Sequence, residues 1–177
     1  MFCKENKLNN KKSIISVKDI TLISIMAVIL FLQKQVLSLI PNFQLTVLLL
    51  VLYSKKVGTL KTIIICFIYA LIDNMVMGTF NVLYTPFLFI GWIFIPIFLN
   101  TIFKKVESSI ALAFLGVLFS FIYCWLFLIP NCIVLQMDFI TYLLSDIVWE
   151  ILMASSSFLS ILLLYKPCYN ALSMLLI

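Results

Sequence analysis

The chain has 177 residues and a formal net charge of +5, and 64% of its residues are hydrophobic whereas only 11% are charged. Soluble domains contain roughly 45–50% apolar residues, so this composition predicts a polytopic membrane protein with room for a single bundle. The sequence contains no His, which excludes zinc-protease motifs, His-ligated haem and Ser-His-Asp triads, and its five cysteines lack metal or redox spacing. We therefore expect no metal site and no cofactor.

The N-terminal part combines a polar segment with a first membrane span. Residues 1–17 are rich in Lys and Asn and lack the hydrophobic region of a signal peptide, so they are expected to form a cytoplasmic tail. The first span is predicted at residues 20–40, and its far half contains Gln33, Lys34 and Gln35. Because such a polar cluster is costly in lipid, it should face protein.

The second apolar run, at residues 45–53, has only nine residues before polar residues resume. A helix needs about 20 residues to cross the apolar part of a bilayer. This run can cross only if Asn42, Phe43 and Gln44 lie below the membrane surface. The connection between the first two spans is therefore predicted to dip inward, which is tolerated where backbone is buried in protein or lines a cavity.

The rest of the chain predicts four more spans, which completes an all-α fold of six transmembrane helices in one bundle. They are expected at residues 59–77, 86–103, 109–129 and 140–167, with loops at residues 78–84 and 131–139. Asp73 and Asn74 lie near the far end of the third span. Pro96 should kink the fourth span, and Pro167 is expected to end the sixth helix, so that residues 166–177 form a short interfacial helix.

The lysines predict the orientation of these spans. Eleven of the twelve lysines fall on the N-terminal tail, on the even-numbered connections or near the C-terminus. Cytoplasmic segments carry an excess of positive charge, so both termini are predicted to be cytoplasmic in a multi-pass protein of the cell membrane. The remaining lysine is Lys34.

Charged residues inside the predicted spans point to a binding site. Asp146 and Glu150 are four residues apart, so they share one helix face, on which Trp149 also lies. With Lys34 and Asp73 they are the only ionisable acids and bases well inside the spans, and all lie in the outer halves. Four isolated charges would cost about 10–14 kcal/mol, which favours one shared outward-facing cavity.

A small-molecule site in that cavity is the predicted function of these groups. Three acids against one lysine favour a cationic or amine-bearing ligand over a polyanion. In the alternative, Lys34 pairs with one acid only to hold helices together. The candidate substrate-binding residues are Lys34, Gln44, Asp73, Asn74, Asp146, Trp149 and Glu150.

Four segments resemble a known family when they are taken in order: PNFQLTVLLLVLYSKKVG, YALIDNMVMG, TPFLFIGW and DIVWEILMASSSFLSILLLYKPCYNAL. They are similar to the substrate-binding S components of energy-coupling factor (ECF) vitamin transporters over about residues 17–172. The resemblance implies a six-helix, substrate-binding domain at residues 18–177 that captures a vitamin or related micronutrient from outside. It also implies a lid between the first two helices, matched by Asn42, Phe43 and Gln44, and three partners: a membrane coupling subunit and two cytoplasmic ATPases.

The sixth helix departs from the family pattern. The acid of the family motif is kept in Trp149-Glu150, but its His and Asn are replaced by Met153 and Ser157, so no particular substrate is carried over. No GxxxxGK[ST] motif is present, and any ATP use must belong to a partner.

Two alternatives come from other functional classes. One is a membrane interaction or assembly protein that transports nothing. The other is an intramembrane enzyme that uses Asp73 with Asp146 or Glu150, but the glycine usual beside such an aspartate is missing. We therefore expect no enzyme activity, no catalytic residue and no nucleic-acid partner.

Overall fold

The computed structural model describes residues 16–40, 42–76 and 83–175. These residues form six helices: α1 (Val17–Val36), α2 (Thr46–Lys56), α3 (Thr59–Val76), α4 (Tyr84–Thr101), α5 (Ser109–Leu135) and α6 (Phe139–Leu175). No strand occurs within the described ranges, which confirms the all-helical class for this part of the chain. Most of the predicted tail and of the predicted loop at residues 78–84 lies outside the described residues.

Five of the six helices, all except α2, are long and apolar enough to cross a membrane. They indicate a membrane-embedded protein. α2 has 11 residues, which corresponds to about 17 Å of helix, whereas the apolar part of a bilayer is about 30 Å thick. The prediction of six spans is therefore confirmed only in part, because α2 does not reach the required length by itself.

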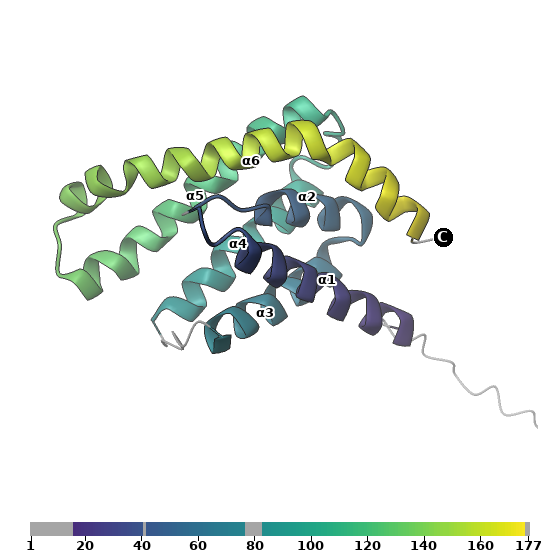
Figure 1. Ribbon diagram of the computed structural model, residues 1–177, viewed down its shortest axis with the longest axis horizontal. Helices are drawn as coiled ribbons and strands as arrows, with labels where there is room; N and C mark the ends of the chain where they lie inside the picture. Colours follow the sequence, from purple (N-terminus) through teal and green to yellow (C-terminus); the bar gives the residue numbers. More distant parts are fainter. Residues whose placement is uncertain (1–15, 41, 77–82, 176–177) are drawn as a thin grey trace, which may run out of the picture.

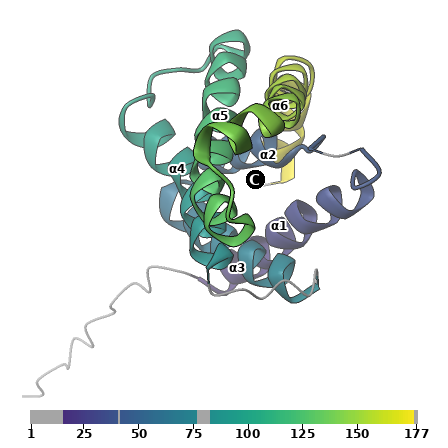
Figure 2. The ribbon, with the colours of Figure 1, turned by 90° about the vertical axis from the view of Figure 1, so that its left-hand side faces the viewer.

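The short α2 is the central helix of the bundle. It contacts all five other helices, and in the end-on view it lies between α1, α4, α5 and α6 (Figure 2). Eight of its eleven residues are buried. A helix enclosed on all sides can be apolar around its whole circumference, which explains the uninterrupted apolar run in the sequence.

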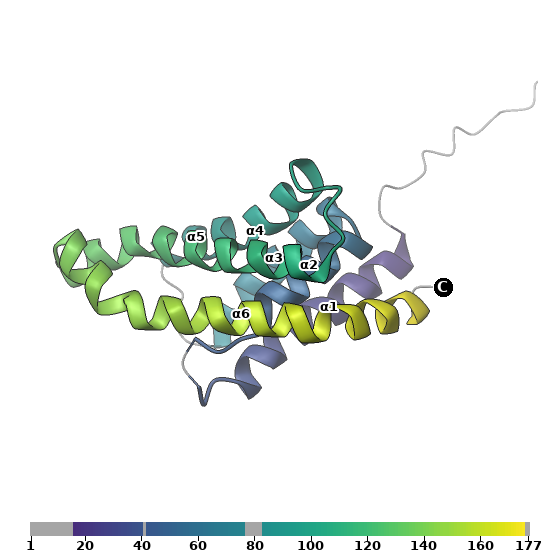
Figure 3. The same ribbon diagram turned by 90° about the horizontal axis from the view of Figure 1, so that it is seen from above.

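The remaining helices surround α2 in two groups. α1, α3 and α4 pack in series on one side, and α5 and α6 form a long antiparallel pair on the other (Figure 3). The start of α1 and the end of α6 lie at the same end of the bundle, while the α5–α6 connection projects at the other end (Figure 1).

Two helices continue past prolines that were expected to end them. α5 runs through Pro130 to Leu135, and α6 runs through Pro167 to Leu175, so the predicted ends at residues 129 and 167 and the separate interfacial helix are wrong. A proline inside a helix costs about 3 kcal/mol or more. Contacts made beyond each proline offset part of this cost: Asn131 Oδ1, directly after Pro130, accepts from the Tyr84 hydroxyl at 2.8 Å. Beyond Pro167, the Tyr169 ring lies 3.7 Å from the Lys56 ammonium.

α1 is displaced relative to the predicted first span at residues 20–40. It begins earlier because Ser16 caps it: the Ser16 hydroxyl accepts from the Asp19 backbone N–H at 3.2 Å, and the Asp19 carboxylate accepts from the Ser16 N–H at 3.0 Å. The other Asp19 oxygen accepts from Lys61 at 2.5 Å, which ties the start of α1 to α3. α1 ends at Val36, so four predicted residues belong to the connection instead.

Candidate functional site

The connection between α1 and α2 is held by side chains of the helices that flank it. The Gln33 Oε1 atom accepts from the Leu45 backbone N–H at 2.8 Å, and Gln33 Nε2 donates to the Thr46 hydroxyl at 2.8 Å. That hydroxyl in turn donates to Gln44 Oε1 at 2.8 Å. These bonds satisfy polar groups of a segment that has no helical hydrogen-bond ladder.

The same connection is also bonded to the middle of α6. Asn42 adopts the left-handed backbone conformation, with φ of 56°, which Asn tolerates better than most residues. Its amide donates to the Trp149 carbonyl oxygen at 3.2 Å. The Gln44 carbonyl oxygen accepts from the Ser156 hydroxyl at 3.4 Å, and Gln44 Nε2 lies 3.7 Å from the Met153 sulfur. The connection therefore lies against α6 rather than beyond the end of the bundle.

A pocket of about 260 Å³ lies beside this connection. Its lining combines one cation, several polar groups and two aromatic rings: Lys34, Leu37, Ser38, Ile40, Asn42, Phe43, Gln44 and Tyr123. A mainly apolar wall with a few placed polar groups is typical of small-molecule sites.

The charge on the pocket wall is neutralised by an ion pair. The Lys34 ammonium lies 2.7 Å from Asp73 Oδ2 and 2.8 Å from Asp73 Oδ1. The Asp73 side chain is 6% exposed and that of Lys34 is 30% exposed. This pairing agrees with the alternative in which Lys34 joins helices, and it uses one of the three predicted acids.

Tyr123 also lines the pocket, and a glycine makes room for its ring. Its ring stacks on that of Trp92 with 4.0 Å between the ring centroids. A Cβ atom on Gly91 would lie 2.7 Å from the Tyr123 ring. Gly91 is therefore required for close approach rather than for backbone freedom.

Glu150 is buried without a cation. Its side chain accepts from Trp125 Nε1 at 3.3 Å through Oε2, and the residue is only 3% exposed. The other oxygen, Oε1, is buried and has no hydrogen-bond partner among the described residues. No described lysine forms an ion pair with Glu150 or with the half-buried Asp146 one turn earlier. A buried carboxylate oxygen needs a hydrogen-bond donor, which makes Oε1 a candidate contact for a ligand.

Five of the seven predicted residues fall into two groups. Lys34 and Gln44 line the pocket, and Asp73 lies behind Lys34. Glu150 and Asp146 are not part of that lining and lie on the α5–α6 side. Met153 of α6 contacts both the connection and α5, because its sulfur lies 3.7 Å from Gln44 Nε2 and 3.6 Å from Cys124 Sγ.

Two predicted residues lie away from both groups. Asn74 is buried and donates to the Ala70 carbonyl oxygen of its own helix at 2.7 Å. Trp149 is 41% exposed, and its carbonyl oxygen accepts from the Asn42 amide.

Sequence reasoning did not assign a role to the residues that position the connection. From the sequence, Gln33 is predicted only to belong to a polar cluster that faces protein, although a hydrogen-bonding side chain in an apolar span signals a buried partner. Thr46 carries no such signal, because it sits at the start of an apolar run and a hydroxyl is common there.

Comparison with known proteins identifies no relative: no protein-family model, curated protein or solved structure matches this chain. Three features of the chain itself therefore bear on its function. They are the pocket beside the α1–α2 connection, the Lys34–Asp73 pair on its wall, and the buried Glu150 oxygen Oε1, which has no partner among the described residues.

Proposed function

We propose that this chain is the substrate-binding membrane component of an ECF-type transporter, which captures a vitamin or related small micronutrient from outside. The pocket of about 260 Å³ beside the α1–α2 connection carries this proposal. The connection is bonded to α1 by Gln33 and to α6 by Asn42 and Gln44. A segment held on both sides of a pocket by a few hydrogen bonds can act as a lid over a bound molecule.

The size and charge of the site favour a small ligand that carries positive charge. Ligand pockets usually measure about 300–1,000 Å³, so a pocket of about 260 Å³ suits a compound of one or two rings. Lys34 is already neutralised by Asp73. Glu150 lies outside the lining and keeps an oxygen without a partner among the described residues. An amine-bearing heterocycle reaching that oxygen would satisfy it, whereas a polyanion would not.

The proposed orientation places both termini in the cytoplasm and the pocket near the outer surface. Lysines from α2, α6 and the α4–α5 connection meet at the end of the bundle where α6 finishes, as expected for a cytoplasmic face. α2 would complete a sixth crossing together with the inward-lying connection. Energy would come from two cytoplasmic ATPases, acting through a membrane coupling subunit.

A thermal-shift screen of the purified chain against a panel of vitamins tests the proposal directly. Anything that binds only the folded state raises the melting temperature, by an amount that grows with ligand concentration. We expect at least one compound to do so, and we expect Phe43→Ala and Gln44→Ala to reduce the shift. No shift with any compound would favour the non-transporting interaction protein.

Coupling is tested separately. The chain is expected to co-purify with a co-expressed ECF module and to show no sustained uphill uptake in liposomes that contain it alone. Uphill uptake by the isolated chain would refute the proposal.

A further inference from the structure

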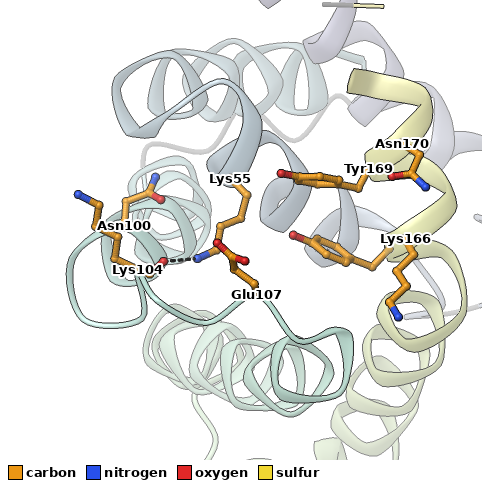
Figure 4. A pocket seen from close by; sticks show the side chains of 8 residues that line it. Lys55, Asn100, Lys104, Glu107, Lys166, Tyr169 and Asn170 are labelled. Carbon is orange, nitrogen blue, oxygen red and sulfur yellow. Dashed lines mark hydrogen bonds between the residues drawn. The ribbon is translucent and has the colours of Figure 1, made fainter. Parts of the chain in front are cut away.

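A second pocket, of about 510 Å³, lies at the other end of α2 from the connection described above. Its walls come from α2, α4, α6 and the α4–α5 connection (Figure 4). The lining is polar and aromatic: Lys55, Asn100, Lys104, Glu107, Tyr165, Lys166, Tyr169 and Asn170. A cytoplasmic face accounts for the lysines at this end, but neither it nor the proposed micronutrient site accounts for the tyrosines and asparagines that line the same pocket.

The charge of the second pocket is unbalanced. Three lysines and one glutamate line it, a formal excess of two positive charges. The ion pairs of the described residues, Lys34–Asp73 and Lys61–Asp19, involve none of the lining residues. Lys104 and Lys166 are both exposed. Their charges are therefore available to an anion.

Lys55 is held in place at the pocket wall. Its ammonium donates to the carbonyl oxygens of Phe103 and Lys104, each at 3.1 Å, and the second of these bonds is visible in Figure 4. A lysine ammonium has three N–H donors. The two carbonyls therefore leave one donor of a positioned cation for a ligand.

Neighbouring side chains fix the surrounding wall. The Asn100 amide donates to the Ser54 carbonyl oxygen at 3.0 Å and to the Thr59 hydroxyl at 2.8 Å, which holds the α2–α3 junction. The Tyr169 ring lies 3.7 Å below the Lys56 ammonium, and its hydroxyl points into the pocket (Figure 4). A rigid rim of this kind reduces the ordering cost of binding.

We infer that this pocket binds a phosphate-bearing anion, and that the headgroup of an anionic phospholipid is its ordinary source. A phosphate group offers several acceptor oxygens to ammonium and hydroxyl donors. Basic pockets between membrane helices at the cytoplasmic surface bind acidic headgroups for this reason. A soluble phosphate ester has the same chemistry and would occupy the same place. The inference rests on the proposed orientation of the chain and not on the proposed transport function.

The test separates these two sources of phosphate. Short-chain phosphatidylglycerol is titrated into the detergent-solubilised full chain, with short-chain phosphatidylcholine as the zwitterionic control, and glycerol 3-phosphate forms a third arm. The melting temperature is followed at each concentration. We expect stabilisation by phosphatidylglycerol and not by phosphatidylcholine. Stabilisation by glycerol 3-phosphate alone would assign the site to a soluble ester.

Charge variants tie any binding to the pocket. A lysine near the membrane surface contributes about five-fold to the affinity for an anionic headgroup, so Lys104→Gln with Lys166→Gln should weaken binding about 25-fold. Glu107→Gln removes the one acid of the lining and should tighten binding about five-fold. Lys105→Gln is the matched control, because Lys105 is exposed beside Lys104 and does not line the pocket.

All four positions are exposed, so each variant should melt as the wild type does without added anion. Stabilisation by neither phosphate compound would overturn the inference. An effect of Lys105→Gln as large as that of the double variant would also overturn it, because binding would then follow the charge of the whole surface.

Discussion

The Lys34 ammonium and the Asp73 carboxylate are 2.7 Å apart and join α1 to α3 beside the candidate pocket. The two sides of this pair are unequal, because Asp73 is almost fully enclosed whereas Lys34 is 30% exposed. Losing the lysine would leave a buried carboxylate without a cation. The Lys61–Asp19 pair at the other end of α1 has the same chemistry, but its side chains are 29% and 23% exposed.

This difference predicts unequal effects on stability. Lys34→Met should lower the free energy of unfolding by about 3–5 kcal/mol, as for a broken buried pair. Lys61→Met should cost less than about 1 kcal/mol, because exposed pairs contribute little. Thermal unfolding in detergent measures both. Combining Lys34→Met with Asp73→Leu should recover most of the loss, and a double variant as unstable as Lys34→Met would contradict a direct pairing energy.

Two glutamines on α1 should respond in opposite ways to the same substitution. Gln33→Leu removes the acceptor of the Leu45 N–H and a donor to Thr46, so it should destabilise the chain by about 1–3 kcal/mol. Gln35→Leu should be neutral or slightly stabilising, because it removes a buried amide nitrogen that has no partner among the described residues.

Hydrogen exchange of the α1–α2 connection provides the second readout for this pair. Exchange at residues 42–45 should accelerate in Gln33→Leu and remain unchanged in Gln35→Leu. Equal acceleration in both variants would show that the connection is not held by Gln33.

Gly91→Ala should destabilise the chain although alanine favours helices. The added Cβ atom would meet the Tyr123 ring at 2.7 Å, and that ring is stacked on Trp92. Overpacking of this kind costs about 1–3 kcal/mol, which exceeds the gain of about 1 kcal/mol in helix propensity. Gly116→Ala should lose less, because its close contact is with the terminal methyl group of Ile161, which can move. A rise in the melting temperature of Gly91→Ala would contradict the tight wall.

Glu150→Gln should weaken binding of the micronutrient, once the vitamin panel has identified it. Losing a charged hydrogen-bonding partner typically costs about 1.5–3 kcal/mol, or about ten-fold to a hundred-fold in affinity. Titration of the identified compound into the purified wild type and variant, followed by thermal shift, measures the change in affinity. Glu107→Gln serves as the control, because Glu107 lines the other pocket. Unchanged affinity in Glu150→Gln, together with loss of binding but not of stability in Lys34→Met, would favour an anionic ligand held by Lys34.

Single cysteines in a cysteine-free background test the orientation. Lys105→Cys lies at the lysine-rich end of the bundle, and Met137→Cys lies in the α5–α6 connection at the other end. A membrane-impermeant thiol reagent added to intact cells should label Met137→Cys and spare Lys105→Cys. The reverse pattern would invert the proposed topology.

Local features of the sequence were sufficient to predict much of this architecture. The all-helical class and the approximate position of each helix follow from long apolar runs separated by polar residues. The unusual α1–α2 connection was predicted from one number, the short length of the second apolar run. Lys34 was predicted as a candidate site residue because a charged group in an apolar span needs a partner, and Gln44 because it belongs to the predicted inward-dipping connection; both line the candidate pocket.

Tertiary structure decided the features that depend on contacts between distant segments. Pro130 and Pro167 remain inside helices, and side chains beyond each proline contact other helices, whereas the sequence by itself shows only the local penalty. Spacing along the chain could not select Asp73 as the partner of Lys34, because Asp146 and Glu150 also lie inside the predicted spans. For the same reason, the sequence could not show that Glu150 lies outside the pocket lining. Helix packing around α2 decides which charged side chains meet. This packing is the result of many weak contacts between helices, and no single segment of the sequence specifies it.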